Sequence, residues 1–250
     1  MRTDRRIFLD VGFDVAPMRQ LLAEIADVGA GTPYAYLVTP NVDHLVRLHG
    51  KHSEIPGLAD IYCKARFCTC DSKVLAGLAR WRGVDLPVLP GSDIAELMFE
   101  RVIVPDDSIA IIGGDDALLA GLRARFPAIE FAQHQPPMGL MQNAAARRAA
   151  AEFIAARKPR FTFICVGSPQ QELIAAEAGK IDGSSGLALC VGAALDFITG
   201  GQKRAPLLAR RLGLEWAHRL LTNPRRMWRR YLVEGPAIFL LAYRWKRSAA

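Results

Sequence analysis

The sequence lacks any apolar run long enough to cross a membrane as a helix, and it contains few cysteines. A membrane-spanning helix needs about 20 predominantly apolar residues. Near the start of the chain, Asp10 ends the apolar run that begins at Ile7, well short of the core of a signal peptide. The five cysteines are an odd number in a chain too long to depend on disulfide bonds. These absences predict a protein of the reducing cytoplasm with free thiols.

Several ligand-binding motifs are absent as well. There is no Gly-x-Gly-x-x-Gly dinucleotide fingerprint, no internal repeat and no recognisable nucleic-acid-binding module. Cys68 and Cys70 invite a metal-binding interpretation, but no Cys or His pair stands at ligand spacing nearby. Alternation along a short strand places both side chains on one face, which favours buried core thiols. We therefore predict neither a cofactor nor a metal ion.

Positive charge is abundant but unevenly distributed. The whole chain carries +7, whereas Lys203 to Ala250 has twelve Lys and Arg against two Glu, a net of +10, which leaves about −3 for the rest. Such a tail suits nucleic acid, an anionic membrane or a phosphorylated substrate, since all three present clustered negative charge. Strand-like patterning stops near Gly200 and Gly201. We predict an α/β domain over residues 1–201 and an arginine-rich helical appendage over residues 202–250.

Short β-rich runs alternate with amphipathic stretches over most of the chain. The predicted strands are Tyr34–Thr39, Phe67–Cys70, Ser108–Ile112, Phe161–Val166 and Gly186–Val191. The predicted helices are Met18–Val28, Val42–Leu48, Ser72–Arg82, Ile94–Val102, Ala117–Phe126, Asn143–Arg157 and Gln170–Glu177. This alternation is typical of a Rossmann-like, mostly parallel sheet with helices on both faces.

Polar motifs follow the five predicted strands. They are Thr39-Pro-Asn41, Asp71, Gly113-Gly114, Gly167-Ser-Pro-Gln-Gln171 and Gly192. In open α/β sheets, ligands bind beyond the carboxyl ends of the strands, where loops meet helix N-termini. We therefore expect these motifs to gather at one ligand-binding edge.

Most of these residues also have a plain structural interpretation. Asp71 and Asn41 suit the N-cap of the helix that follows each of them. The two glycines at 113 and 114 fit an ordinary strand-to-helix turn as well as a phosphate-binding one. Glu172 suits the positive end of a helix, whereas Gln171 has no comparable local role, which favours a substrate contact.

The basic tail has amphipathic character. A helix from Arg225 to Leu232 would separate arginines from Met227, Trp228 and other apolar residues. The apolar stretch Pro236–Tyr243 is too short to span a bilayer and is followed by cationic residues. This pattern is typical of a helix that lies among lipid headgroups, although packing on the domain or on a dimer partner would also satisfy it.

The chain resembles the WecG/TagA/CpsF glycosyltransferase family. The resemblance covers roughly residues 10–230 and rests on Thr39-Pro-Asn41, Val166–Glu172, Val191–Phe197, Arg204-Ala-Pro206, Gly213–Trp216, Arg219 and Pro224–Arg226. Gln135-Pro-Pro137 with Gly139 is similar to the family's Pro-x-Gly loop. The chain departs from the family pattern at Ser72, where members carry Gly, and at Leu195, where they carry an aromatic residue.

The resemblance implies an inverting enzyme that moves a sugar from a UDP-sugar donor to a polyprenyl-diphosphate-linked acceptor on the cytoplasmic face of the inner membrane. Asp71 would be the general base, and Thr39 and Asn41 would place the reacting groups. The substrate-binding residues would be Gly113, Gly114, Pro137, Gly139, Gly167, Gln171, Glu172, Gly192, Asp196, Arg204, Arg219 and Arg226. No Asp-x-Asp pair is present to hold a metal, so tail arginines would neutralise the leaving diphosphate.

Two other classes of function remain open at this level. The chain could be a peripheral membrane scaffold whose sheet only binds ligands, or a nucleic-acid-binding protein driven by its basic tail. The missing nucleic-acid module disfavours the second alternative, so we expect no nucleic-acid partner. A homo-oligomer is compatible with the sequence.

Overall fold

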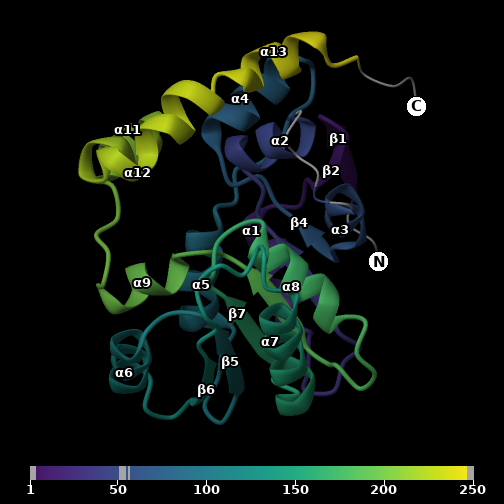
Figure 1. The fold of residues 1–250 in the computed structure, drawn as a ribbon, viewed down its shortest axis with the longest axis vertical. Coiled ribbons are helices and arrows are strands. Elements are labelled where there is room, and N and C mark those ends of the chain that lie inside the picture. Colours follow the sequence, from purple (N-terminus) through teal and green to yellow (C-terminus); the bar gives the residue numbers. More distant parts are fainter. Residues whose placement is uncertain (1–3, 51–54, 56, 247–250) are drawn as a thin grey trace.

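The computed structural model describes residues 4–50, 55 and 57–246, apart from the side chain of Arg226. Its strands are β1 (Arg5–Phe8), β2 (Val11–Asp14), β3 (Ala35–Val38), β4 (Phe67–Cys68), β5 (Ser108–Ile112), β6 (Glu130–His134), β7 (Phe161–Ile164) and β8 (Leu187–Cys190). β1 and β2 form an antiparallel hairpin, and the others form a parallel sheet in the order β4-β3-β8-β7-β5-β6. The predicted α/β architecture is confirmed (Figure 1).

The helices between the strands also follow the prediction. They are α1 (Met18–Ala26), α2 (Val42–His49), α3 (Leu58–Lys64), α4 (Lys73–Trp81), α5 (Gly91–Arg101), α6 (Asp116–Arg125), α7 (Ala144–Arg157), α8 (Gln170–Ala178) and α9 (Ala194–Thr199). The seven helices predicted in this part of the chain are present, whereas α3 and α9 were not predicted. Both are short, at seven and six residues, so they contain too few turns to show a clear apolar period.

Side chains alternate between two hydrophobic cores, one on each face of the sheet. On β8, Leu187 and Leu189 enter the core formed with α1, α5, α6 and α9, whereas Ala188 and Cys190 enter the core formed with α2, α3, α4, α7 and α8. Cys68 and Cys70 lie together in the second core as buried free thiols. Their predicted placement on one face is confirmed.

The hairpin and β6 were not predicted from the sequence. β6 is an edge strand on which only Phe131 is buried, so its sequence lacks the apolar run of an inner strand. The hairpin nevertheless fixes the other edge of the sheet. Its buried Asp14 accepts hydrogen bonds from Arg5 Nε at 2.9 Å and from the Cys68 N–H at 2.6 Å. This contact holds β4 directly before Asp71.

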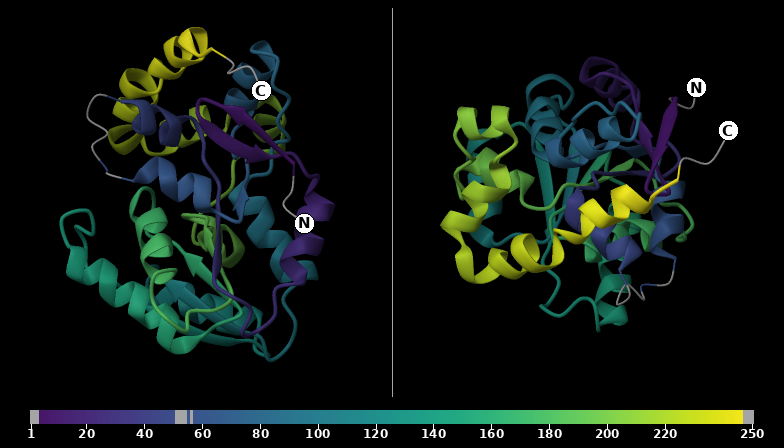
Figure 2. Two further views of the ribbon diagram at one scale, coloured as in Figure 1. Left: turned by 90° about the vertical axis from the view of Figure 1, so that its right-hand side faces the viewer. Right: turned by 90° about the horizontal axis from the view of Figure 1, so that it is seen from above.

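Residues 202–246, here called the appendage, lie along one end of the molecule beyond α2 and α4 (Figures 1 and 2). Its elements are α10 (Leu207–Leu212), α11 (Glu215–Thr222), α12 (Pro224–Trp228), the π-helix η1 (Arg229–Glu234) and α13 (Ala237–Arg244). Ile238 and Ala242 of α13 are buried against the domain, while Phe239 and Tyr243 are exposed. The apolar end of the tail therefore packs on the domain with one face and leaves the other open.

Candidate active site

The five predicted polar motifs lie at one edge of the sheet. The strands that precede them, β4, β3, β8, β7 and β5, are neighbours and run parallel, so their carboxyl ends point the same way. Asp71 and Asn41 stand at one end of this row and Gly113 at the other. The sequence-based expectation of a common edge is confirmed.

Asp71 is held by contacts from two other loops. Its Oδ1 accepts a hydrogen bond from the Gly91 N–H at 2.9 Å, and its Oδ2 lies 3.4 Å from the Asn41 Nδ2 donor. The N-cap of α4 is Ser72, whose hydroxyl accepts from the Leu75 N–H, so the capping interpretation of Asp71 is wrong. The side chain is left free of helix capping and faces the site.

The surroundings of Asp71 shift its proton affinity. Burial raises the pKa of the carboxyl, and the Gly91 N–H, the charge of Arg219 and the Asn41 amide offset part of that rise. A carboxylate with a raised pKa is a stronger base, which suits general-base chemistry.

Asn41 both caps the helix that follows it and lies beside Asp71, so its structural and its functional interpretation hold together. Its Oδ1 accepts from the Asp43 N–H at 3.1 Å and caps α2, while its Nδ2 reaches Asp71. Thr39 is buried beside it and donates its hydroxyl hydrogen to the Cys190 carbonyl at 3.1 Å. Asn41 therefore stands next to the Asp71 carboxylate and lines the cleft described below, whereas Thr39 is buried and does not line it.

A cleft of about 500 Å³ opens between the sheet edge and the appendage. Asn41, Asp43 and Asp71 line its domain side, and the appendage contributes arginines together with apolar side chains such as Trp216 and Phe239. The lining arginines are Arg210, Arg211, Arg219 and Arg230. The cleft thus joins carboxylates on one wall to guanidinium groups on the other.

These arginines differ in how far their charge is already neutralised. Arg210 pairs with Asp93 at 2.9 Å, and Arg230 pairs with Asp43 at 3.2 Å. Within the part of the chain that the structure describes, Arg211 and Arg219 have no ion-pair partner within 4.0 Å. Arg219 therefore offers charge to a ligand at this site.

Arg204 and Arg226 were also predicted to bind substrate, but the structure does not show either side chain in the cleft lining. Arg204 is absent from the cleft lining, because it binds Asp93, Glu96 and Ser92 of α5 and ties the start of the appendage to the domain. Arg226 lies in α12, but its side chain is outside the described residues. A substrate contact of either residue stays a prediction.

Several predicted positions lie along the same edge but do not line this cleft. They are Gly113, Gly114, Pro137, Gly139, Gly167, Gly192 and Asp196. Gly113 has a φ of +93°, and a Cβ there would come within 2.8 Å of Val166, so a close approach of two strand ends requires the glycine. Pro137 and Gly139 are exposed in the loop after β6. Their roles in binding stay predictions.

Asp196 lies in the first turn of α9 and is partly buried. Burial and the nearby charge of Asp115 raise the pKa of its carboxyl. Its Oδ2 accepts from Gln202 Nε2 at 3.1 Å, and no arginine partner is found for it among the described residues. A structural role for Asp196 as the partner of an arginine is therefore not seen in this part of the structure, and its binding of a ligand stays a prediction.

Gln171 and Glu172 are almost fully buried, at 3% and 1% exposed. The Gln171 Oε1 accepts from the Gly192 N–H at 3.0 Å, and its Nε2 donates to Glu172 at 2.9 Å. The inference that Gln171 lacks a structural role is wrong, because it links the start of α8 to the loop after β8. The side chain of Glu172 faces the buried His44 ring.

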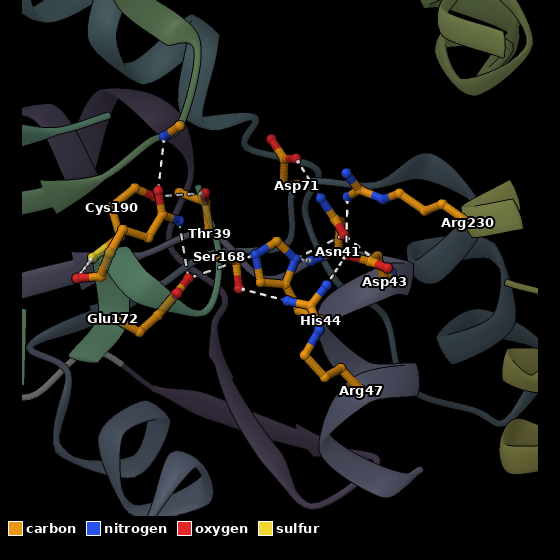
Figure 3. A network of polar contacts seen from close by, with 12 residues as sticks. Thr39, Asn41, Asp43, His44, Arg47, Asp71, Ser168, Glu172, Cys190 and Arg230 are labelled. Atoms are coloured by element: carbon orange, nitrogen blue, oxygen red, sulfur yellow. Dashed lines mark hydrogen bonds and ion pairs between the residues drawn. The ribbon is translucent and has the colours of Figure 1, made fainter. Parts of the chain in front are cut away.

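Sequence reasoning missed His44, Gly91 and Arg230 as parts of this site (Figure 3 shows His44 and Arg230). One signal was available for His44, which stands three residues after the N-cap Asn41, at the position that can close a capping box. The contact of Gly91 with Asp71 and that of Arg230 with Asp43 join residues distant in the chain. Local patterns carry no sign of them.

The sequence model described as "Glycosyl transferase WecG/TagA/CpsF family" matches residues 6–250, nearly the whole chain. The chain therefore belongs to this family. It is a glycosyltransferase of surface polysaccharide synthesis, which implies a nucleotide-sugar donor and a lipid-linked acceptor. Among the described helices, none has the length and apolar content to cross a bilayer.

Proposed function

From this membership, we propose that the chain is an inverting, metal-independent transferase that moves a sugar from a UDP-sugar to a polyprenyl-diphosphate-linked saccharide. The acceptor hydroxyl loses its proton to the Asp71 carboxylate as its oxygen attacks the anomeric carbon. The bond from that carbon to the UDP oxygen breaks on the opposite face. A single displacement of this kind inverts the anomeric configuration.

The observation that carries this proposal is the cleft itself, which places Asp71 opposite Arg219 and Arg211. Negative charge grows on the diphosphate as the sugar departs, and guanidinium groups stabilise it without a metal ion. Thr39 and Asn41 would help to place the reacting groups: Asn41 lines the cleft with its amide 3.4 Å from the base, and the buried Thr39 would hold the neighbouring strand end from behind the cleft lining.

The appendage fits a lipid-linked acceptor. Its exposed surface combines arginines with large apolar side chains, including Leu208, Leu221, Trp228 and Tyr243. Apolar side chains flanked by cations favour an anionic lipid surface. We place the enzyme peripherally on the cytoplasmic face of the inner membrane, where the cleft would receive the acceptor headgroup.

The test is a screen of UDP-sugars against a short-chain polyprenyl-diphosphate saccharide, scored by product mass and anomeric configuration. With the donor that the wild type uses, we expect Asp71→Asn to reduce transfer about a thousandfold or more, because the amide cannot accept the proton. Thermal unfolding and liposome binding should stay unchanged. Transfer by Asp71→Asn at the wild-type rate would refute the mechanism and favour the scaffold alternative.

A further inference from the structure

A line of partly to fully buried polar contacts runs behind the cleft and connects four segments of the sheet edge (Figure 3). It begins at the Gly192 N–H, passes through the amide of Gln171 to the Glu172 carboxylate, and continues through His44 and Asn41 to Asp71. Its members come from the segments that follow β8, β7, β3 and β4, including the first turns of α8 and α2. Such a line couples the position of the base to residues that the cleft does not contain.

His44 occupies the middle of this line and is 7% exposed. Its Nε2 lies 3.5 Å from Glu172 Oε1, and its Nδ1 lies 2.7 Å from Asn41 Oδ1. A separation of 2.7 Å between nitrogen and oxygen is a hydrogen bond only when Nδ1 carries the proton. Both ring nitrogens then face acceptors, which is the arrangement of a positively charged ring.

A neutral ring would change the contact with Asn41. The Asn41 backbone N–H also points at Nδ1, at 3.2 Å, and only an unprotonated Nδ1 accepts from it. The buried Glu172 carboxylate faces the other side of the ring, with its Oε1 3.5 Å from Nε2. Burial raises the pKa of Glu172, but its contacts with His44 and the Gln171 amide outweigh burial and lower it. An ionised, buried carboxylate needs a cationic neighbour.

The orientation of the Asn41 amide follows from these contacts. With its Oδ1 held by the Asp43 N–H and by His44, its Nδ2 can only point towards Asp71. Neither His44 nor Glu172 lines the cleft, so neither reaches a substrate there. Their effect on the reaction must pass through Asn41.

We propose that His44 and Glu172 form a buried positioning pair that fixes the Asn41 amide and, through it, aims the Asp71 carboxylate at the acceptor hydroxyl. This inference rests on the proposed function, because it assigns a purpose to the geometry of that base. It also changes the proposed role of Glu172, which was predicted to contact substrate and is here a positioning residue.

Asp71 should titrate differently without the pair. The groups that act on it are the charge of Arg219 from α11, the charge of His44 from α2, the Asn41 amide and the Gly91 N–H, all of which favour the carboxylate. The neighbouring Cys70 stays neutral, since burial raises the pKa of its thiol to about 12. Loss of the His44 charge therefore raises the pKa of Asp71, and activity should appear at higher pH.

The experiment compares His44→Gln and Glu172→Gln with His49→Gln, a matched control at the far end of the same helix. His49 bonds the Leu9 carbonyl and takes no part in the line. We expect kcat to fall about tenfold or more in the two test variants, with KM for donor and acceptor nearly unchanged, since misplacing a reacting group costs rate. The acidic limb of kcat against pH should move upward in His44→Gln, and His49→Gln should match the wild type.

A second measurement separates this inference from the proposed function. Titration of the Asp71 carboxyl by carbon-13 NMR needs no substrate, so it reports the coupling even if the enzyme uses another donor. An upward shift in His44→Gln supports the pair. Unchanged titration in folded His44→Gln overturns it, as would a loss of kcat that only follows a loss of thermal stability and leaves the pH limb in place.

Discussion

Asp71 is subject to two opposing influences whose balance sets the pH dependence of transfer. Burial favours the protonated carboxyl, whereas the Gly91 N–H and the Arg219 charge favour the carboxylate. Because the net effect raises the pKa of Asp71, its carboxylate is protonated at a higher pH than that of an ordinary aspartate as the solution becomes more acidic. We therefore expect kcat/KM to increase with pH as Asp71 loses its proton, and to fall on the acid side.

Arg219→Gln tests the cationic wall of the cleft. Its charge stabilises both the Asp71 carboxylate and, in our proposal, the leaving diphosphate. We expect kcat/KM to fall about a hundredfold and the acidic limb to move to higher pH. Arg225→Gln is the control, because this exposed arginine of the next helix does not line the cleft. Similar pH profiles for both variants would contradict the assignment.

Gly91 offers a separate test of how tightly the base is placed. A Cβ at this position would lie 3.0 Å from Thr39 Oγ1 and 3.3 Å from Val191, so Gly91→Ala must push Thr39 or the bond to Asp71 aside. We expect kcat to fall about tenfold. Gly77→Ala in α4 meets no atom within 4 Å and should stabilise the fold by about 0.5–1 kcal/mol without loss of rate. Equal kcat values for the two variants would mean that the site tolerates displacement.

At the scale of elements, the inner strands were predictable because they are buried on both faces and read as continuous apolar runs. Strand β7, with Phe161 and Phe163 in one core and Ile164 in the other, is such a case. The edge strand β6 and the short helices lack that signal. The gathering of Asp71 and Asn41 followed from parallel topology alone. The contacts of His44 with Glu172 and of Gly91 with Asp71 did not, since they depend on which distant loops touch.

Ion pairs between α5 and the appendage are a second feature at the scale of elements. Arg204 binds Asp93 and Glu96, and Arg210 binds the same Asp93, so removing Arg204 loosens the start of the appendage. For Arg204→Gln we expect faster amide hydrogen exchange in α10 and α11, with a stability loss below about 1 kcal/mol because the pairs are partly solvated. Arg80→Gln breaks an exposed pair elsewhere and serves as control. Unchanged exchange in α10 and α11 would show that the link does not hold the appendage.

Over the whole molecule, the appendage has two surfaces with different tasks. One surface closes the cleft with Arg219 and packs Ile238 on the domain, and the other exposes Leu221, Trp228 and Tyr243. If the outer surface binds lipid, removing its apolar side chains should abolish membrane attachment and leave sugar transfer intact. Deleting the chain after Gly201 removes both surfaces and should abolish both properties together.

We expect the triple variant Leu221→Gln, Trp228→Gln and Tyr243→Gln to lose flotation with anionic liposomes, because apolar burial drives insertion among headgroups. Transfer to a water-soluble, short-chain acceptor should stay within about threefold of the wild type, since none of the three side chains lines the cleft and the Arg219 wall is intact. The Gly201 truncation, assayed alongside, should lose flotation and transfer. A triple variant that still floats would show that these three side chains are not what binds the membrane, and an active truncation would refute a cleft shared between domain and appendage.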